Sequence, residues 1–139
     1  MSIIYTLGYA RWSVEEVEKQ TRALETVLVD VRHSPRTSKP GFSKTALTAR
    51  LGDRYVHVPA FGNVTYKEGT ITLADPDRGV EIVSGFDRAP ILMCGCHNPN
   101  ECHRSVVAKL LAQRIGGEIQ HLRAPSDPAE PDLFEDTDR

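Results

Sequence analysis

Apolar and polar positions along this chain form blocks that predict strands and helices in alternation. Short apolar runs at residues 3–7, 27–32, 55–58, 91–93 and 118–122 are typical of strands, several of them buried on both faces of a sheet. Start signals and helical spacing predict the intervening helices at residues 14–24, 44–51, 76–85 and from about 102 to 115. The pattern predicts an α/β fold: three layers, with a predominantly parallel sheet of four or five strands and helices on both faces.

Two segments between these elements lack a regular pattern. Residues 33–41 contain two prolines, a glycine and three hydroxyl side chains, and form a longer loop than most connections. Such loops at the carboxyl ends of strands commonly hold ligands in open α/β sheets. Residues 61–73 begin with a turn signal at Gly62 and Asn63, and the sequence leaves open whether residues 70–73 form an edge strand or an extended loop.

Composition and charge narrow the class of protein. The chain has 139 residues and 40% hydrophobic content, which predicts one globular domain over residues 1–123. Residues 124–139 carry six acids and one arginine, for a net charge of −5, and three prolines; we expect this acidic tail to be disordered. No apolar run approaches a membrane span and no leader pattern opens the chain, so we expect no membrane partner and a cytoplasmic location.

The remaining residues, 1–123, carry a net charge of +3, because the whole chain carries −2. Six of their basic residues lie between positions 32 and 54, where Asp53 is the only acid. This basic cluster suits an acidic ligand, although a solvated surface without a partner fits the pattern equally well.

All three cysteines, Cys94, Cys96 and Cys102, lie within nine positions in a loop between a strand and a helix. An odd, clustered set of this kind is typical of metal ligands or reactive thiols rather than of a secreted disulfide framework. Asn100 is a candidate helix cap, which would place Cys102, His103 and Arg104 in the first helical turn. Backbone N–H groups, the helix dipole and the guanidinium there favour an anion or a thiolate. The alternative is a well-capped helix with small buried thiols.

Two kinds of chemistry fit this loop. Cys102 is a candidate nucleophile with His103 or His97 as its base, and Cys94 and Cys96 complete the set of candidate catalytic thiols. Alternatively, Cys94, Cys96, Cys102 and His103 supply the four ligands of a zinc ion. The spacing does not match a standard zinc motif, so we expect no cofactor, with zinc as the exception.

Polar residues follow several of the predicted strands, and the carboxyl ends of parallel strands meet at one edge of a sheet. The residues expected to bind substrate there are Thr6, Tyr9, Asp30, Arg32, Ser34, Arg36, Ser38, His57 and Arg104, and Asn63 belongs to the same edge. Guanidinium groups converging on a cleft favour phosphate or carboxylate, which predicts a small anionic ligand or nucleic acid as the partner. The alternative for Asp30 and Arg32 is a structural ion pair. Lone histidines such as His57 and His121 are more often packing residues.

With these residues in place, the chain resembles the uncharacterised family called domain of unknown function 488 over residues 3–115. The resemblance rests on Tyr5-Thr6-Leu7-Gly8-Tyr9, Val29-Asp30-Val31-Arg32-His33-Ser34-Pro35 with Ser38 and Gly41-Phe42, Tyr55-Val56-His57-Val58-Pro59, and Leu92-Met93-Cys94 leading into Cys102-His103-Arg104. The resemblance implies an α/β fold and no established activity. Cys96 stands where the family pattern has an acidic residue, so an acid–base role for that residue could not operate here unchanged.

A weaker likeness is to rhodanese-type sulfurtransferases, through Leu28-Val29-Asp30-Val31-Arg32 and the cysteine loop before Arg104. Those proteins have about six residues from cysteine to arginine, whereas Cys96 and Arg104 are eight positions apart. The sequence therefore predicts an enzyme that binds an anionic substrate and uses a thiol with histidine and arginine. A persulfide carrier and a non-catalytic nucleic-acid or protein adaptor with a structural cysteine loop remain the alternatives, and the oligomeric state is open.

Overall fold

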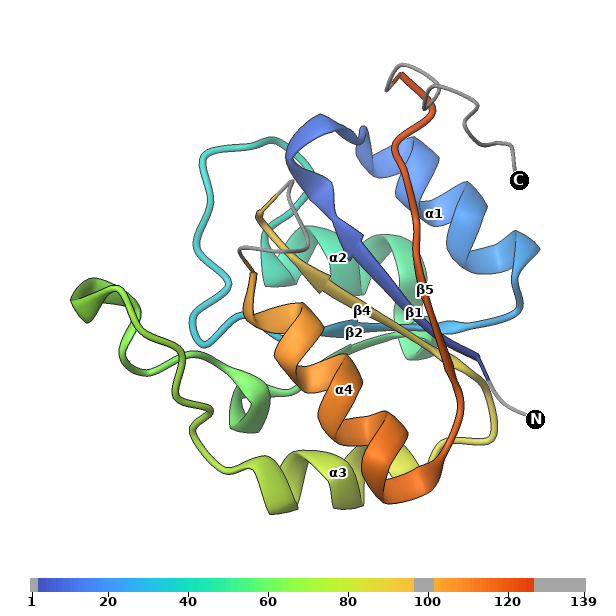
Figure 1. Ribbon diagram of the computed structural model, residues 1–139. Coiled ribbons are helices and arrows are strands. Elements are labelled where there is room, and N and C mark those ends of the chain that lie inside the picture. Colours follow the sequence, from blue (N-terminus) through green and yellow to red (C-terminus); the bar gives the residue numbers. More distant parts are fainter. Residues whose placement is uncertain (1–2, 97–101, 127–139) are drawn as a thin grey trace, which may run out of the picture.

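The fold is a parallel sheet covered by helices on both faces, as the sequence predicts. A computed structural model describes residues 3–96 and 102–126 (Figure 1). Its strands are β1 (Ile3–Gly8), β2 (Val27–Asp30), β3 (Tyr55–His57), β4 (Pro90–Cys94) and β5 (Glu118–His121). They pair in parallel in the order β3-β2-β4-β1-β5. The helices are α1 (Val14–Ala23), α2 (Lys44–Leu51), α3 (Pro76–Ser84) and α4 (His103–Ile115).

Each face of the sheet has its own hydrophobic core, because side chains alternate between the faces along every strand. In β4, Ile91 and Met93 belong to the core that α1 and α2 cover, whereas Leu92 and Cys94 belong to the core that α3 and α4 cover. Every residue of β4 is buried, as expected for a central strand of a parallel sheet. The predicted three-layer arrangement is therefore confirmed.

The predicted helix starts are confirmed for the first three helices. Ser13 and Glu16 form the capping box of α1, with Ser13 Oγ accepting from Glu16 N at 3.1 Å and Ser13 N donating to Glu16 Oε1 at 2.8 Å. Ser43 and Asp75 cap α2 and α3 with their side chains. The start of α4 differs, because Cys102 is its N-cap residue and makes no side-chain cap hydrogen bond. The predicted cap Asn100 lies outside the described residues.

The extended-loop alternative holds for residues 70–73. Only an isolated antiparallel bridge joins Asn63 and Leu73 there, and no strand forms at residues 70–73. The side chain of Asn63 organises the turn: its Oδ1 accepts from the backbone N of Thr65 at 3.1 Å and of Thr72 at 2.9 Å. This loop extends away from the sheet beyond the start of α3 (Figure 1).

The described part of the predicted acidic tail ends at residue 126. Ala124 is buried in the core beneath α1, and Ser126 Oγ donates to Arg11 O at 3.3 Å. Residues 127–139, on which the prediction of disorder rests, lie outside the described residues. None of the described helices has the length and apolar character that a membrane span requires.

The connections out of β1 and β4 leave the sheet in opposite directions. These strands are neighbours, with Gly8 paired to Cys94 in register, yet α1 follows β1 on one face and α4 follows β4 on the other. Strands with this arrangement define a topological switch point, where the diverging loops open a crevice at the carboxyl edge of the sheet. The cysteine loop leaves β4 at this place.

Candidate functional site at the carboxyl edge of the sheet

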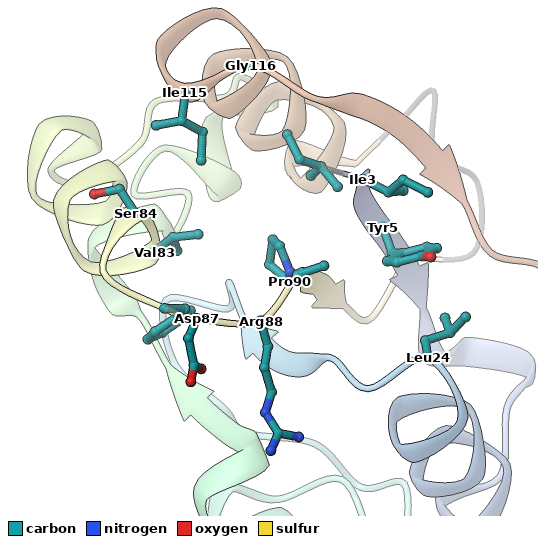
Figure 2. Close-up of a pocket in the computed structure, with 13 residues that line it drawn as sticks. Ile3, Tyr5, Leu24, Val83, Ser84, Asp87, Arg88, Pro90, Ile115 and Gly116 are labelled. Atoms are coloured by element: carbon teal, nitrogen blue, oxygen red, sulfur yellow. The ribbon is translucent and has the colours of Figure 1, made fainter. Parts of the chain in front are cut away.

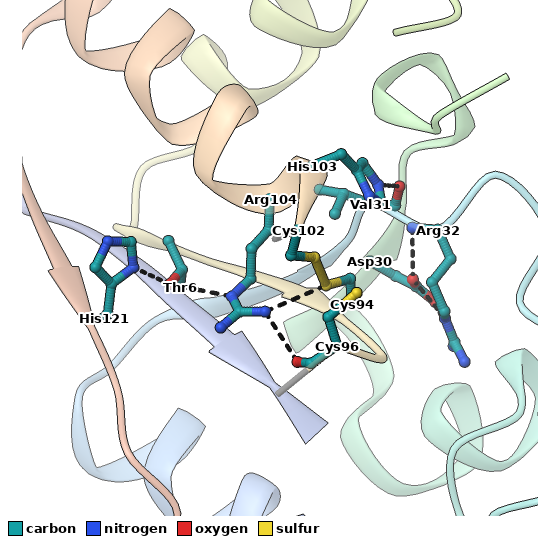
Figure 3. The surroundings of a disulfide bond; sticks show 10 residues. All are labelled: Thr6, Asp30, Val31, Arg32, Cys94, Cys96, Cys102, His103, Arg104 and His121. Carbon is teal, nitrogen blue, oxygen red and sulfur yellow. Dashed lines mark hydrogen bonds and ion pairs between the residues drawn. A yellow bond between two sulfur atoms is a disulfide. The ribbon is translucent and has the colours of Figure 1, made fainter. Parts of the chain in front are cut away.

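The three cysteines come together at the switch point. Cys94 ends β4, Cys96 follows it in the loop, and Cys102 precedes α4; their three Sγ atoms all lie within 4.8 Å of one another (Figure 3). Cys94 and Cys102 form a disulfide and are each 2% exposed, whereas Cys96 is a free, exposed thiol. We call these three residues the thiol cluster. The sequence predicts their proximity, but it favours reactive thiols or metal ligands and does not predict the disulfide.

The buried guanidinium of Arg104 contacts the thiol cluster. Its Nη1 donates to Cys94 Sγ at 3.4 Å and to Cys96 O at 2.9 Å, and its Nε donates to Thr6 Oγ1 at 3.3 Å (Figure 3). Arg104 is only 1% exposed. Burial lowers the pKa of Arg104, but an arginine side chain keeps its proton in proteins, so a positive charge lies against the cluster.

Thr6 links Arg104 to a histidine on the edge strand. Thr6 Oγ1 and His121 Nδ1 are 2.6 Å apart, and the two residues are register partners of β1 and β5. Because Thr6 Oγ1 accepts from Arg104 Nε, its own proton is available to a neutral His121 ring. Burial, then the charges of Arg104 and Lys109, lower the pKa of His121 and favour that neutral form. From the sequence we expect His121 to be a packing residue. Its proximity to Arg104 arises from the register of β1 and β5, which the sequence does not reveal.

A glycine allows the cysteine loop to approach β1. A Cβ atom at Gly8 would overlap the carbonyl oxygen of Cys96 and would lie 2.6 Å from Arg104 Nη1. Gly8 is therefore required by close packing of the loop, because any larger residue would displace Cys96 and Arg104 from each other.

The sequence predicts His103 as a base for Cys102, but the structure hydrogen-bonds its ring to the backbone of Val31. Its Nε2 lies 2.7 Å from Val31 O, which accepts a hydrogen bond, so Nε2 carries the proton and Nδ1 is the unprotonated nitrogen. Burial lowers the pKa of His103, and the nearby charge of Arg104 adds to this effect. His103 is thus held as a neutral imidazole against the end of β2, and its role as a base remains a prediction. His97, the other candidate base, lies outside the described residues.

Asp30 and Arg32 form the structural ion pair that the sequence offers as an alternative to substrate binding. Arg32 Nε donates to Asp30 Oδ1 at 2.8 Å and Arg32 Nη2 donates to Asp30 Oδ2 at 2.6 Å, in a bidentate geometry with Asp30 fully buried. Burial opposes the charge of Arg32, but Asp30 outweighs it and raises the pKa of Arg32. The Arg32 guanidinium is therefore neutralised within the fold.

Further predicted residues complete a network around this pair. Tyr55 OH donates to Asp30 Oδ2 at 2.6 Å, and burial together with this hydrogen bond raises the pKa of Tyr55. Arg32 Nη1 donates to Tyr9 OH at 3.2 Å, and His57 Nε2 donates to Arg32 O at 2.8 Å. Tyr9, Asp30, Arg32 and His57 thus lie together as predicted, while Tyr55 is a member that the sequence reading missed. Its position in an alternating strand gives no sign of the partner of its hydroxyl.

Ser34, Arg36 and Ser38 are exposed in the loop after β2. The structure gives them no hydrogen bond to another described residue, so their predicted contact with substrate remains a prediction. Arg36 is the anion ligand predicted in this loop. Among the described residues, no carboxylate forms an ion pair with it.

Two described cavities lie away from the thiol cluster. One, of about 580 Å³, is at the amino edge of the sheet between α1, α3 and α4, and is lined by Ile3, Tyr5, Leu24, Val83, Pro90 and Ile115 among others (Figure 2). The other, of about 740 Å³, lies at the start of α1 beside Lys39 and Arg50. Neither contains a residue of the predicted substrate set, so the candidate site rests on the geometry of its side chains.

Fold and site together define a doubly wound α/β domain with a thiol cluster at its switch point. A family described as domain of unknown function DUF488 matches residues 13–81, which confirms the predicted resemblance over these residues. The matched segment contains Asp30, Arg32 and Tyr55 but not the cysteines. Neither a curated protein nor a solved structure matches the chain.

Proposed function

We propose that this protein is an enzyme that binds an anionic substrate at the carboxyl edge of its sheet and acts on it with the thiol cluster. The observation that carries the proposal is the cluster of three cysteine sulfurs, one of which, Cys94 Sγ, accepts a hydrogen bond from the buried Arg104 near a helix start. A positive charge and a helix N-terminus both stabilise a thiolate relative to a thiol. An ordinary packing role for small thiols requires neither of these features.

The three cysteines differ in exposure to solvent, and we assign them different roles for this reason. Cys96 is the sulfur that a substrate meets first, since Cys94 and Cys102 are both buried. Cys102, the predicted nucleophile, lies within 4.8 Å of Cys96 and at the start of α4, where the helix dipole favours its thiolate. Arg104 stabilises negative charge on Cys94 by direct contact. In this proposal the Cys94–Cys102 disulfide is reduced, and the cluster then works as one unit in which charge can reside on any of three sulfurs.

The preference for an anion follows from the charges that remain unneutralised. Arg32 is paired with Asp30, so its charge does not attract a ligand. Arg36, exposed on the neighbouring loop, and the N-terminus of α4 remain as positive elements for a phosphate or carboxylate group. A phosphorylated small molecule or a nucleic-acid end fits these elements.

Alkylation kinetics test the proposal. The chain is reduced with a phosphine, treated with iodoacetamide across the neutral range, and each cysteine is followed by mass spectrometry. We expect Cys96 to react faster than the thiol of an unfolded peptide at pH 7, and phosphate or a nucleotide to slow the reaction. Arg36→Ala is expected to weaken this protection, while Arg88→Ala, at the opposite edge of the sheet, leaves it unchanged. Three thiols no more reactive than the peptide, with or without anions, would contradict the proposal.

Two alternatives use the same residues and are separated by simple assays. A persulfide carrier would take up one sulfur atom from thiosulfate and release it to cyanide as thiocyanate. A non-catalytic nucleic-acid adaptor would bind nucleic acid with an affinity that falls as salt rises, without consuming a thiol. Absence of both behaviours, with reactive thiols, leaves the enzyme proposal as the one that fits.

A further inference from the structure

We propose that Cys94, Cys96 and Cys102, once reduced, form a three-thiolate site for a thiophilic metal ion, with zinc as the representative ion. Three sulfur ligands already converge on one point, from the end of a central strand, a loop and the start of a helix. Thiolate sulfur selects ions such as zinc over magnesium or calcium, which prefer oxygen ligands. This proposal is independent of the proposed enzyme activity.

The distances between the sulfurs fit a single ion. A zinc ion binds thiolate at about 2.3 Å, so two of its sulfur ligands lie about 3.8 Å apart in tetrahedral geometry and at most about 4.6 Å apart. The three Sγ atoms all lie within 4.8 Å of one another. Cys94 Sγ and Cys102 Sγ, which are bonded in the disulfide, must move apart to the tetrahedral separation after reduction. Cys96 Sγ needs to approach them by about 1 Å at most, which its position in a loop permits.

The backbone geometry also suits metal ligands. The Cα atoms of Cys94 and Cys102 lie 7.7 Å apart. Disulfides usually join cysteines whose Cα atoms are about 4.4–6.8 Å apart. An ion between the two sulfurs spans a wider separation than a direct sulfur–sulfur bond, so the dithiol form of this pair accommodates a metal without moving β4 towards α4.

Among the described residues, the ligand set consists of three cysteines and does not include His103. The Nε2 atom of His103 is hydrogen-bonded to Val31 O, and the ring does not join the group of ligand atoms around the sulfurs. Zinc sites with three protein ligands keep a fourth position for water or substrate, whereas structural sites are usually closed by four. With the ligands that the described residues supply, the inferred site therefore has an open position, unlike the Cys3His set that the sequence offers.

Arg104 contacts two of the ligand residues without binding the ion itself. Three thiolates and one zinc ion carry a net charge of −1, and the Arg104 guanidinium, 3.4 Å from Cys94 Sγ, offsets that charge. Its bond to Cys96 O at 2.9 Å holds the loop in place for the third ligand. Partners of this kind orient the ligands and contribute about 10–100-fold to metal affinity.

Metal binding requires the reduced protein, because a disulfide sulfur is not a thiolate. A phosphine supplies the two electrons: it takes the oxygen of one water molecule to become a phosphine oxide, and the two protons of that water go to Cys94 and Cys102 as the sulfur–sulfur bond breaks. The chain with the Cys94–Cys102 disulfide is thus the matched metal-free control for the same polypeptide.

The test is an anaerobic titration of the full reduced chain with Co²⁺, followed by displacement with Zn²⁺. We expect one ion per chain, sulfur-to-cobalt charge-transfer absorption, tetrahedral d–d bands, and zinc affinity measurable against a chromophoric chelator. Cys94→Ser, Cys96→Ser and Cys102→Ser should each weaken binding by more than the about 10–100-fold expected for Arg104→Met. His103→Gln should leave both the spectrum and the affinity unchanged.

Three results would overturn the inference. The first is a reduced wild-type chain that shows no charge-transfer band and no competition with the chelator. The second is wild-type binding that is lost in His103→Gln, which would restore the Cys3His set. The third is equal binding by Cys96→Ser, which would leave only two thiolates. When a chelator is included in the alkylation assay, the protein there is metal-free, so failure of the metal site leaves the test of the enzyme proposal unaffected.

Discussion

Two buried arginines lie at the carboxyl edge of the sheet, and they have opposite kinds of partner. Arg32 is held by the carboxylate of Asp30, whereas the described partners of Arg104 are a hydroxyl, a carbonyl oxygen and a cysteine sulfur. A guanidinium paired with a buried carboxylate has its charge cancelled within the fold. We propose from this comparison that Arg104 serves the thiol cluster and that Arg32 supports the fold.

The largest difference between the two arginines should appear in stability. Arg32→Met leaves Asp30 as an uncompensated buried charge and should cost about 3–5 kcal/mol. Urea unfolding of the reduced chain measures it. The double variant Asp30→Asn with Arg32→Met should recover a large part of the loss, since no lone charge remains. If Arg32→Met costs no more than an ordinary surface substitution, Arg32 does not have the supporting role assigned to it.

Arg104→Met is the matched substitution on the other side. It removes hydrogen bonds to neutral groups and leaves no carboxylate unpaired among the described residues, so we expect a smaller cost of about 1–3 kcal/mol. The alkylation rate of Cys96 and the metal affinity should fall in this variant but not in the double variant at Asp30 and Arg32. Equal effects of both variants on the thiols would remove the distinction between the two arginines.

The sequence predicts the Arg32 side more completely than the Arg104 side, for a physical reason. Asp30 and Arg32 are two positions apart on one strand, so strand geometry alone places them on one face and offers the ion pair. The helix starts at Ser13, Ser43 and Asp75 are equally local and were predicted correctly. On the other side, the order of strands in the sheet brings together Thr6, His121 and Arg104. Local sequence patterns do not reveal that order.

For the cysteines too, the sequence predicts the local arrangement but not the contacts with distant residues. Their clustering in the chain predicts that they lie close together, and the position of Arg104 two residues after Cys102 predicts a charge near them. The orientation of His103 towards Val31 depends on the end of β2, which is distant in the sequence. Whether this histidine faces a sulfur therefore could not be derived from the motif that contains it.

Thr6 tests how firmly Arg104 is held. Thr6→Val removes the acceptor of Arg104 Nε and the partner of His121, and should cost about 1–2 kcal/mol. Thr6→Ser keeps the hydroxyl and should retain most of the stability and the alkylation rate of Cys96. Urea unfolding and the alkylation assay measure the two variants side by side. A valine variant whose thiols react as in the wild type would show that Arg104 does not depend on Thr6.

The smallest expected effect concerns His121, the outermost member of the Arg104 side. Burial and the charges of Arg104 and Lys109 lower its pKa below the ordinary value of 6.5, so the unfolded chain takes up a proton at a pH where the folded chain does not. Its contribution is present above pH 6.5 and is lost as the pH falls through that value towards the folded pKa. Because His121 is largely exposed, the loss should be below about 0.5 kcal/mol. His121→Asn, measured by urea unfolding at pH 7.5 and 5.5, should show a correspondingly weaker dependence on pH, whereas a stronger one would mean that His121 is protonated in the folded chain and donates to Thr6.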